Sequence, residues 1–278
     1  MAVVSGARGS DVARKSAARN ARADLEGIGP VTVQHGRTNM GARVCVVVLL
    51  LLGLPQSVVV GQSQQRDGNL YRWDGQQWLA VEGYGVRLSV GPDGAPWVVN
   101  SRNEIFRFVN GKFDRLPGAA TDIGVGGDGS AWIIGTDSNV YRWNQGNWDR
   151  MPGTGVAISV DRSGSAWVVN AANEIYRWIP ERFERLPGSA RDVGAESQTF
   201  IVGTDSQIYR WESSKWSPLG GMGVRVSAGA DGTAWVVNPA GDIYRWQNGS
   251  VQKLPGSATD VGANAKGDAW VVGTPGGR

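Results

Sequence analysis

One repeat of about 35 residues, present in six copies between residues 69 and 278, constrains this chain more than any other feature. Its most regular part is a tetrapeptide of an aliphatic residue, an aromatic residue, arginine and a second aromatic residue. The tetrapeptide begins at Leu70, Ile105, Val140, Ile175, Ile208 and Ile243, with steps of 35, 35, 35, 33 and 35 residues. A fixed period of this size predicts an array of similar units that bury a core by packing against one another.

Each copy contains four short runs rich in β-branched and aromatic residues, separated by turns that contain glycine. In the second copy the runs cover residues 122–125, 131–134, 140–143 and 148–151. In three copies an Asp-Gly dipeptide, which suits a tight hairpin, separates the first two runs. The pattern predicts one four-stranded antiparallel meander per copy, and therefore an all-β fold, a six-bladed β-propeller.

The two ends of the array indicate how the ring closes. The repeats begin with a third strand, at residues 70–73, and stop after a second strand, at residues 270–272. We therefore expect one composite blade, in which the first two strands come from residues 258–273 and the last two from residues 69–82. Such a closure would leave no free strand edges for another chain to pair with.

Aromatic residues and arginines recur at fixed positions in the copies. One series is Trp97, Trp132, Trp167, Phe200, Trp235 and Trp270, and another is Trp78, Phe113, Trp148, Phe183 and Trp216, with Val251 in the sixth place. An aromatic residue at constant phase predicts core packing between blades. The arginine of each tetrapeptide is expected to stack on an aromatic ring or to pair with a carboxylate of a neighbouring blade.

The composition excludes several classes of function. Cys45 is the only cysteine and His35 the only histidine, and both precede the repeats, so that the repeats hold no thiolate or imidazole for a metal or a nucleophile. Residues 1–61 carry a net charge of +4 and the remainder −1, so we expect no nucleic-acid partner for the repeats. No copy carries an added acidic pair, so we expect neither an enzyme nor a cofactor.

The segment before the repeats has the pattern of a targeting sequence. Met40 opens a short stretch with one arginine, an apolar run and then Pro55, which is typical of a secretory signal peptide over residues 40–61. Residues 1–39 would then be a disordered extension or the product of a wrongly chosen start codon, and residues 62–278 the propeller. The alternative is a membrane anchor at residues 44–60, although this run is short for a span. We expect a secreted, extracellular or periplasmic protein, with N-terminal anchoring as the alternative.

The succession of motifs in each copy resembles a known repeat. Ile-Tyr-Arg-Trp is followed by an aromatic residue, by Leu-Pro-Gly-Ser-Ala-Thr-Asp-Val-Gly and by Asp-Gly-x-Ala-Trp-Val-Val, a pattern similar to that of the tectonin β-propeller family. The resemblance covers residues 69–278 and departs from the pattern in the fourth copy, where residues 195–198 lack Asp-Gly. It implies a six-bladed propeller, often secreted, whose characterised members mostly bind carbohydrates.

The copies also alternate in their loops. After the second strand, three copies have Asn (Asn100, Asn170, Asn238) and three have Gly-Thr (at residues 135, 203 and 273), so that the true unit is a pair of blades repeated three times. Three equivalent pockets would follow. The connections from the second to the third strand of each copy should lie at the same end of the ring. Our candidates for sugar-binding residues in these connections are Asn100, Asn103, Asp137, Ser138, Asn170, Asn173, Asp205, Ser206 and Asn238. The alternative is that these residues only terminate strands and complete turns.

These observations lead to two functional hypotheses. The first is a monomeric lectin-like protein with about three equivalent sites, which recognises glycans or polysaccharides on microbial or other cell surfaces. The second is a propeller scaffold that binds a protein partner and has no sugar activity.

Overall fold

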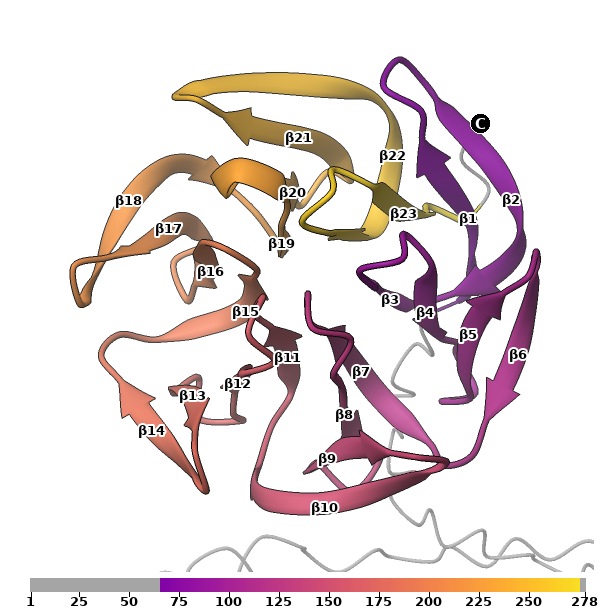
Figure 1. The fold of residues 1–278 in the computed structure, drawn as a ribbon. Helices are drawn as coiled ribbons and strands as arrows, with labels where there is room; N and C mark the ends of the chain where they lie inside the picture. The colour runs from indigo at the N-terminus through magenta and orange to yellow at the C-terminus, as the bar shows by residue number, and fades with distance from the viewer. Residues whose placement is uncertain (1–65, 276–278) are drawn as a thin grey trace, which may run out of the picture. The chain divides into compact units, whose positions relative to one another are not determined.

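The computed structural model describes residues 66–275, which form a ring of six four-stranded blades (Figure 1). The expected extension at residues 1–39 and the expected signal peptide or anchor at residues 40–61 lie outside the described residues. Among the residues that are described, no helix is long and apolar enough to cross a membrane.

We number the blades in chain order. Blade 1 consists of β3 (Arg87–Val90), β4 (Pro96–Val99), β5 (Ile105–Val109) and β6 (Lys112–Leu116). Blade 2 consists of β7 (Ala120–Val125), β8 (Ala131–Gly135), β9 (Asn139–Asn144) and β10 (Asn147–Thr154). Blade 3 consists of β11 (Ala157–Val160), β12 (Ala166–Val169), β13 (Ile175–Ile179) and β14 (Arg182–Leu186). Blade 4 consists of β15 (Ala190–Ala195), β16 (Thr199–Gly203), β17 (Gln207–Glu212) and β18 (Lys215–Met222).

Blades 5 and 6 share one long strand. Blade 5 contains β19 (Arg225–Ala228), β20 (Ala234–Val237) and β21 (Asp242–Gln247), with the short 3-10 turn η1 (Ala230–Gly232) before β20. Its fourth strand is the first part of β22 (Ser250–Ala263). The second part of β22 pairs with β23 (Ala269–Gly273) and thereby begins blade 6.

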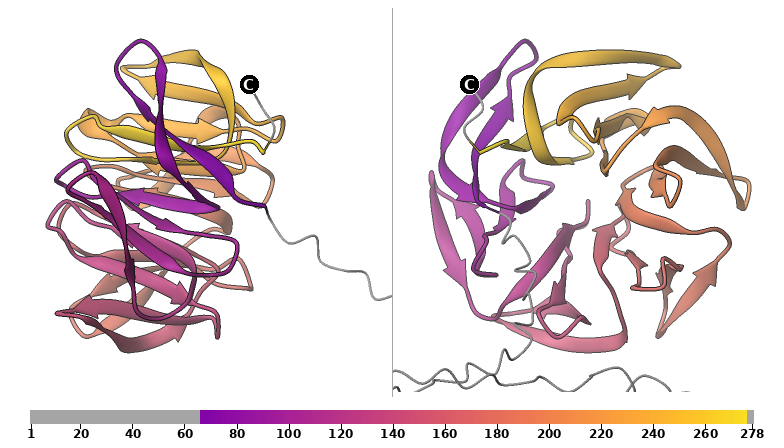
Figure 2. Two further views of the ribbon diagram at one scale, coloured as in Figure 1. Left: turned by 90° about the vertical axis from the view of Figure 1, so that its right-hand side faces the viewer. Right: turned by 180° about the vertical axis from the view of Figure 1, so that it is seen from behind.

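Blade 6 is the predicted composite blade. β1 (Gly68–Trp73) lies between β23 and β2 (Trp78–Gly85), and both pairings are antiparallel. The register sets Leu70 opposite Val272 and Arg72 opposite Trp270. In both views of Figure 2 the first strand of the ring, in indigo, lies beside the last, in yellow. The predicted closure by residues from both ends of the array is confirmed.

The core lies in layers between adjacent blades. The first strand of each blade is nearest the centre of the ring and the last is at its outer edge (Figure 1). Side chains of the first two strands are almost all buried, because they face a neighbouring blade on either side, whereas those of the outer strand are mostly exposed. One layer joins Trp97 and Ile105 of blade 1 to Ile123 and Ile133 of blade 2, and the same arrangement recurs around the ring.

The interfaces around the axis alternate, as a two-blade unit requires. At three of them a serine hydroxyl accepts a hydrogen bond from a backbone N–H of the next blade, as Ser89 does from Val125 (2.9 Å). At the other three a buried aspartate does so: Asp122 accepts from Ile158 (2.8 Å), Asp192 from Val226 (2.7 Å) and Asp260 from Leu88 (2.8 Å). The predicted threefold repeat of blade pairs therefore extends to the axis.

Arginines are distributed unequally among the three axial aspartates. Arg225 lies 3.3 Å from Asp192 and 3.6 Å from Asp260, measured between side-chain nitrogen and oxygen atoms. Arg87, at the matching position of blade 1, lies 3.8 Å from Asp122. In blade 3 this position holds Ala157. Three carboxyl groups thus face two guanidinium groups, and the ion pair of Asp122 is the longest of the three.

The structure bears out the core role of the inner aromatic series and refines that of the arginines. Trp132 has no exposed surface, and the other members of its series are 4% exposed or less. Four of the six tetrapeptide arginines stack on a tryptophan, as Arg107 does over Trp97 at 5.1 Å and Arg177 over Trp167 at 5.1 Å. The pairing with a neighbouring blade was wrong, because ring and carboxylate partners belong to the same blade, where antiparallel pairing sets arginine opposite tryptophan.

Candidate functional site

Three hollows of similar construction open at one end of the ring, where the second strand of a blade connects to the third. Each lies beside a half-buried tryptophan of the outer strand, and we call them the tryptophan wells. Their volumes are about 310 Å³ in blade 2, 250 Å³ in blade 4 and 300 Å³ in blade 6. The tryptophans are Trp148, Trp216 and Trp78.

The preceding blade holds each tryptophan in place. The indole N–H of Trp148 donates a hydrogen bond to the carbonyl oxygen of Pro117 at 2.9 Å, and those of Trp216 and Trp78 donate to Pro187 and Pro255 at 2.8 and 2.9 Å. A glycine follows each of these prolines, and in blade 2 a Cβ added to Gly118 would lie only 3.1 Å from the Trp148 ring. The rings are therefore fixed before any ligand arrives.

A tyrosine and a carboxylate form the opposite wall in blades 2 and 4. The Tyr141 hydroxyl donates to Asp137 at 2.7 Å, and Tyr209 donates to Asp205 at the same distance. Hydrogen bonds from Asn139 and Tyr141 lower the pKa of Asp137 to about 2, and hydrogen bonds from Tyr209 and Gln207 lower the pKa of Asp205. Both carboxylates stay charged and can accept further hydrogen bonds from hydroxyl groups.

The Gly-Thr motif explains why the wells occur in alternate blades. A Cβ on Gly135 would lie 2.8 Å from the Tyr141 ring, and the equivalents at Gly203 and Gly273 give 2.9 and 2.8 Å. Glycine therefore allows the tyrosine to lie close against the loop. The following threonines, Thr136 and Thr204, are exposed at the rims of the wells.

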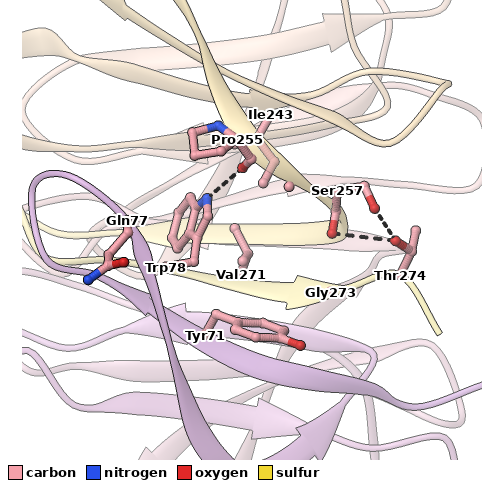
Figure 3. Close-up of a pocket in the computed structure, with 10 residues that line it drawn as sticks. Tyr71, Gln77, Trp78, Ile243, Pro255, Ser257, Val271, Gly273 and Thr274 are labelled. Carbon is pink, nitrogen blue, oxygen red and sulfur yellow. Dashed lines mark hydrogen bonds between the residues drawn. The ribbon is translucent and has the colours of Figure 1, made fainter. Parts of the chain in front are cut away.

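The well of blade 6 has different polar groups. Figure 3 shows Trp78 and Tyr71 on either side of Val271, with Ser257 and Thr274 hydrogen-bonded at one end. Pro275 occupies the position of the aspartate, and Gln77 contributes an amide to the rim. The three wells thus share their aromatic walls but differ in charge.

A related hollow of about 220 Å³ lies in blade 3. Phe183 takes the place of the tryptophan, and Asn170 and Tyr176 form part of the wall. The Tyr176 hydroxyl donates to Glu174 at 2.9 Å. A smaller hollow with a similar arrangement of residues is therefore present in blade 3, which has Asn instead of Gly-Thr after its second strand.

Three of the predicted site residues line these hollows, namely Asp137, Asp205 and Asn170. The side chains of Asn100, Asn170 and Asn238 are engaged within their own loops. Each Oδ1 accepts two backbone N–H groups, and each Nδ2 donates to a carboxylate four residues later, at 2.7 Å for Asn100 and Glu104. This is the turn-completing geometry that we considered as the alternative.

The remaining candidates occupy tight turns at the same end of the ring. Asn103, Asn173, Ser138 and Ser206 all have positive φ, between 63° and 68°. Their carbonyl oxygens accept hydrogen bonds from the first strand of the next blade or the connection leading to it, each at 2.9 Å. They hold the rims of the hollows in position.

The well tryptophans are the residues that our sequence reasoning assigned only to the core. A signal for them was present in the outer aromatic series, which has tryptophan in the three Gly-Thr copies and phenylalanine or valine in the three Asn copies. This alternation matches the two-blade unit, whereas the buried inner series does not alternate.

The irregular fourth copy carries no second polar site around Glu196. This residue is 7% exposed, and both its carboxylate oxygens receive hydrogen bonds from Arg162 of blade 3, at 3.0 and 3.1 Å. Its backbone carbonyl also accepts a bond from the Arg162 N–H. The pair fastens the shortened turn to the neighbouring blade.

The repeats match a known protein family. The model of the Tectonin domain matches residues 54–136, 120–207 and 204–276. The chain belongs to the tectonin family. The three matches overlap and together cover residues 54–276. The resemblance found in the repeat motifs is confirmed.

Two curated tectonins match over short stretches. Tectonin-2 of Physarum polycephalum is 44% identical over 43 residues, which cover 16% of this chain and 12% of that protein. Tectonin-1 of the same organism is 45% identical over 40 residues, 14% of this chain and 18% of that protein. The alignments therefore span less than a fifth of either relative.

Solved structures support the fold of this tectonin. The WD40 propeller domain of Doa1 superposes with a TM-score of 0.55 at 14% identity, covering 74% of this chain and 83% of that one. U3-55K gives a TM-score of 0.52 at 12% identity, with 70% and 74% covered. At such identities the likeness concerns the propeller fold alone.

Proposed function

We propose that this tectonin is a secreted, non-enzymatic lectin whose tryptophan wells each bind one sugar residue of a cell-surface glycan. The observation that carries the proposal is the recurrence, three times around one end of the ring, of a fixed and half-buried indole beside hydroxyl, amide or carboxylate groups. An indole face packs against the C–H groups of a pyranose ring. Polar groups at the rim can pair with its hydroxyls.

The polar groups of each well indicate which sugars it would accept. In blades 2 and 4 a charged carboxylate, Asp137 or Asp205, accepts hydrogen bonds from neutral sugar hydroxyls and disfavours acidic sugars. The blade 6 well has only neutral groups, namely Gln77, Ser257 and Thr274. We therefore expect neutral monosaccharides in all three wells, with the well of blade 6 more tolerant of an acidic substituent.

A glycan array probed with the full-length protein tests the proposal. The test variant replaces Trp78, Trp148 and Trp216 together by alanine. Phe113→Ala is the matched control, because Phe113 occupies the same strand position in blade 1 and pairs with Phe108 in the same way. We expect binding by the wild type and the control, and a loss of at least tenfold in the triple variant. Absence of glycan binding by the wild type would contradict the proposal.

A protein-binding scaffold is the second candidate, and one observation favours it. Large apolar side chains are exposed around the same end of the ring: Tyr84 (63%), Val156 (48%), Met222 (51%) and Val224 (41%). Tyr84 and Met222 occupy matching positions at the ends of β2 and β18, and Val156 and Val224 occupy matching positions in the connections that leave blades 2 and 4. A pull-down that captures a single defined protein would favour this candidate. The capture should be abolished by Tyr84→Ser and Met222→Ser but retained in the triple tryptophan variant.

Secretion belongs to the same proposal. Mass spectrometry of the N-terminus of the native protein tests it directly. A mature chain that starts near residue 62 supports cleavage of a signal peptide. A chain that retains residues 44–60 in a membrane fraction supports the anchor instead.

A further inference from the structure

Two aromatic contacts recur around the ring, one between adjacent blades and one within a blade. The third-strand ring of a blade pairs with the second-strand ring of the preceding blade, as Trp143 does with Trp97 at 6.3 Å and Trp178 with Trp132 at 5.7 Å. It also pairs with the fourth-strand aromatic of its own blade, at 4.8 Å for Trp143 and Trp148. The fourth-strand ring in turn covers a glycine of the preceding connection.

Blade 5 breaks this pattern. Val251 stands where the other five blades have an aromatic residue, and it is 56% exposed. Trp246 has turned to cover Gly221, where an added Cβ would lie 2.8 Å from the indole ring. Trp246 thereby takes the place of the missing fourth-strand ring and pairs with Tyr244 at 5.7 Å. Within residues 66–275 it forms no aromatic pair with Phe200, its expected partner on blade 4.

The rotation of Trp246 leaves a hollow of about 310 Å³ between blades 4 and 5. Phe200, Arg210 and Leu219 line it from blade 4, and Trp246, Asn248 and Val251 line it from blade 5. It opens at the end of the ring that carries the hairpin turns, opposite to the tryptophan wells, because Gly232 and Gly249 of those turns complete the wall. Two departures from the repeat meet here, since Phe200 also replaces the tryptophan of the other copies.

We propose that this hollow is a separate binding site for a neutral, planar aromatic group with a hydrogen-bonding substituent, such as an indole or a phenol. The shape argues for a ring, because an aromatic ring fills the equivalent space between blades 1 and 2, 2 and 3, and 3 and 4. The charge argues for neutrality, because Arg210 is already paired with Glu212.

The walls offer suitable partners for such a group. The half-buried Trp246 provides an aromatic surface, against which a ring can pack edge-to-face or offset, whereas Phe200 lines the hollow but is only 1% exposed. The Nε atom of Arg210 is buried and has no acceptor among residues 66–275. The amides of Gln247 and Asn248 are exposed at the rim and can pair with an indole N–H or a phenol O–H. This site does not depend on the proposed lectin function.

Titration of the full-length protein with p-cresol and with N-acetyltryptophanamide tests the site by ligand-detected NMR. Val251→Trp and Val251→Phe restore the residues of the other copies and close the hollow, whereas Val251→Ala leaves it open. We expect saturable one-to-one binding with a Kd on the order of 0.1–1 mM in the wild type and in Val251→Ala. Both filling variants should weaken it at least tenfold, with thermal melting as the check on folding.

Two further ligands test whether the site requires a planar aromatic group and whether that group belongs to a protein or to a small molecule. Cyclohexanol, similar in size but not planar, should bind at least tenfold more weakly than p-cresol. A Gly-Gly-Trp-Gly-Gly peptide that binds at least tenfold more tightly than N-acetyltryptophanamide indicates a protein partner, and equal affinity indicates a small aromatic ligand. Absence of saturable binding, or binding that the folded filling variants retain, would overturn the proposal.

Discussion

Asp122 is one of three buried aspartates near the axis of the ring, and its environment makes the stability of the ring depend on pH. Burial raises the pKa of Asp122 to about 7 and that of Asp260 to about 6, although Arg87 opposes both shifts. Burial also raises the pKa of Asp192. An aspartate in the unfolded chain has a pKa of about 3.9. Between about pH 4 and pH 7 the folded ring therefore binds protons that the unfolded chain releases.

The sign of this linkage predicts that the ring loses stability as the pH rises from 5 to 8. The lowered pKa values, such as that of Asp137, act only below about pH 4.5 and leave this window unchanged. Asp122→Asn removes a contribution on the order of 2–3 kcal/mol between pH 5 and pH 8. Calorimetric melting at both pH values should show a Tm several degrees lower at pH 8 in the wild type and a smaller difference in the variant.

The exposed carboxylate of Asp149 provides the control for this prediction. Asp149→Asn alters a residue of the outer strand far from the axis and should leave the pH dependence of the Tm unchanged. A wild-type protein that melts at the same temperature at pH 5 and pH 8 would contradict the raised pKa values of the axial carboxyl groups.

At the scale of strands, β1 links the two halves of blade 6 that come from opposite ends of the repeats. It pairs with β23 and with β2, so that its removal exposes one edge of β23 and uncovers the core around Trp235 and Val271. We predict that deletion of residues 69–83 unfolds or aggregates the chain, as measured by thermal melting and by size-exclusion chromatography.

Complementation distinguishes loss of this strand pair from a general effect of truncation. Co-expression of the deleted protein with a separate fragment of residues 66–86 should restore a soluble ring with a cooperative transition, because the pairing needs no covalent link to β3. A deleted chain that melts like the wild type would show that blade 6 is not required for closure.

The strands and the closure were predictable from the sequence, whereas the binding surfaces were only partly so. The repeat period and β-branched runs define the strands locally, and the phase at which the array starts and stops defines the composite blade. The alternation at Gly135 and Thr136 correctly indicated paired blades. Side-chain orientation was not predictable. The side chain of Asn100 forms hydrogen bonds within its own turn, and the orientation of Trp246 depends on its contacts in the folded ring, so neither follows from the repeat pattern.

At the scale of the whole molecule, one rigid ring carries three wells on the same end. Each well is small, so that a single sugar should bind weakly, and affinity for a surface should come from simultaneous engagement. We predict binding to a glycan-coated surface about 10²–10⁴-fold tighter than to the free monosaccharide. Surface plasmon resonance can measure the affinity at decreasing density of immobilised glycan. The increase in affinity over the free monosaccharide should disappear once the glycans are spaced further apart than the wells.

Partial variants test this multivalency. Trp148→Ala leaves two tryptophan wells and should reduce surface binding more than it reduces the affinity of the remaining sites for free sugar. A variant that loses surface binding and free-sugar binding in the same proportion would point to one dominant site.

The number of sugars bound per chain tests the central claim most directly. Isothermal titration of the full-length protein with the monosaccharide that the array selects measures this number. The three wells predict a stoichiometry close to three in the wild type, close to two in Trp148→Ala and no binding in the triple tryptophan variant. A stoichiometry of one, or heat of binding that persists in the folded triple variant, would contradict the assignment of the tryptophan wells.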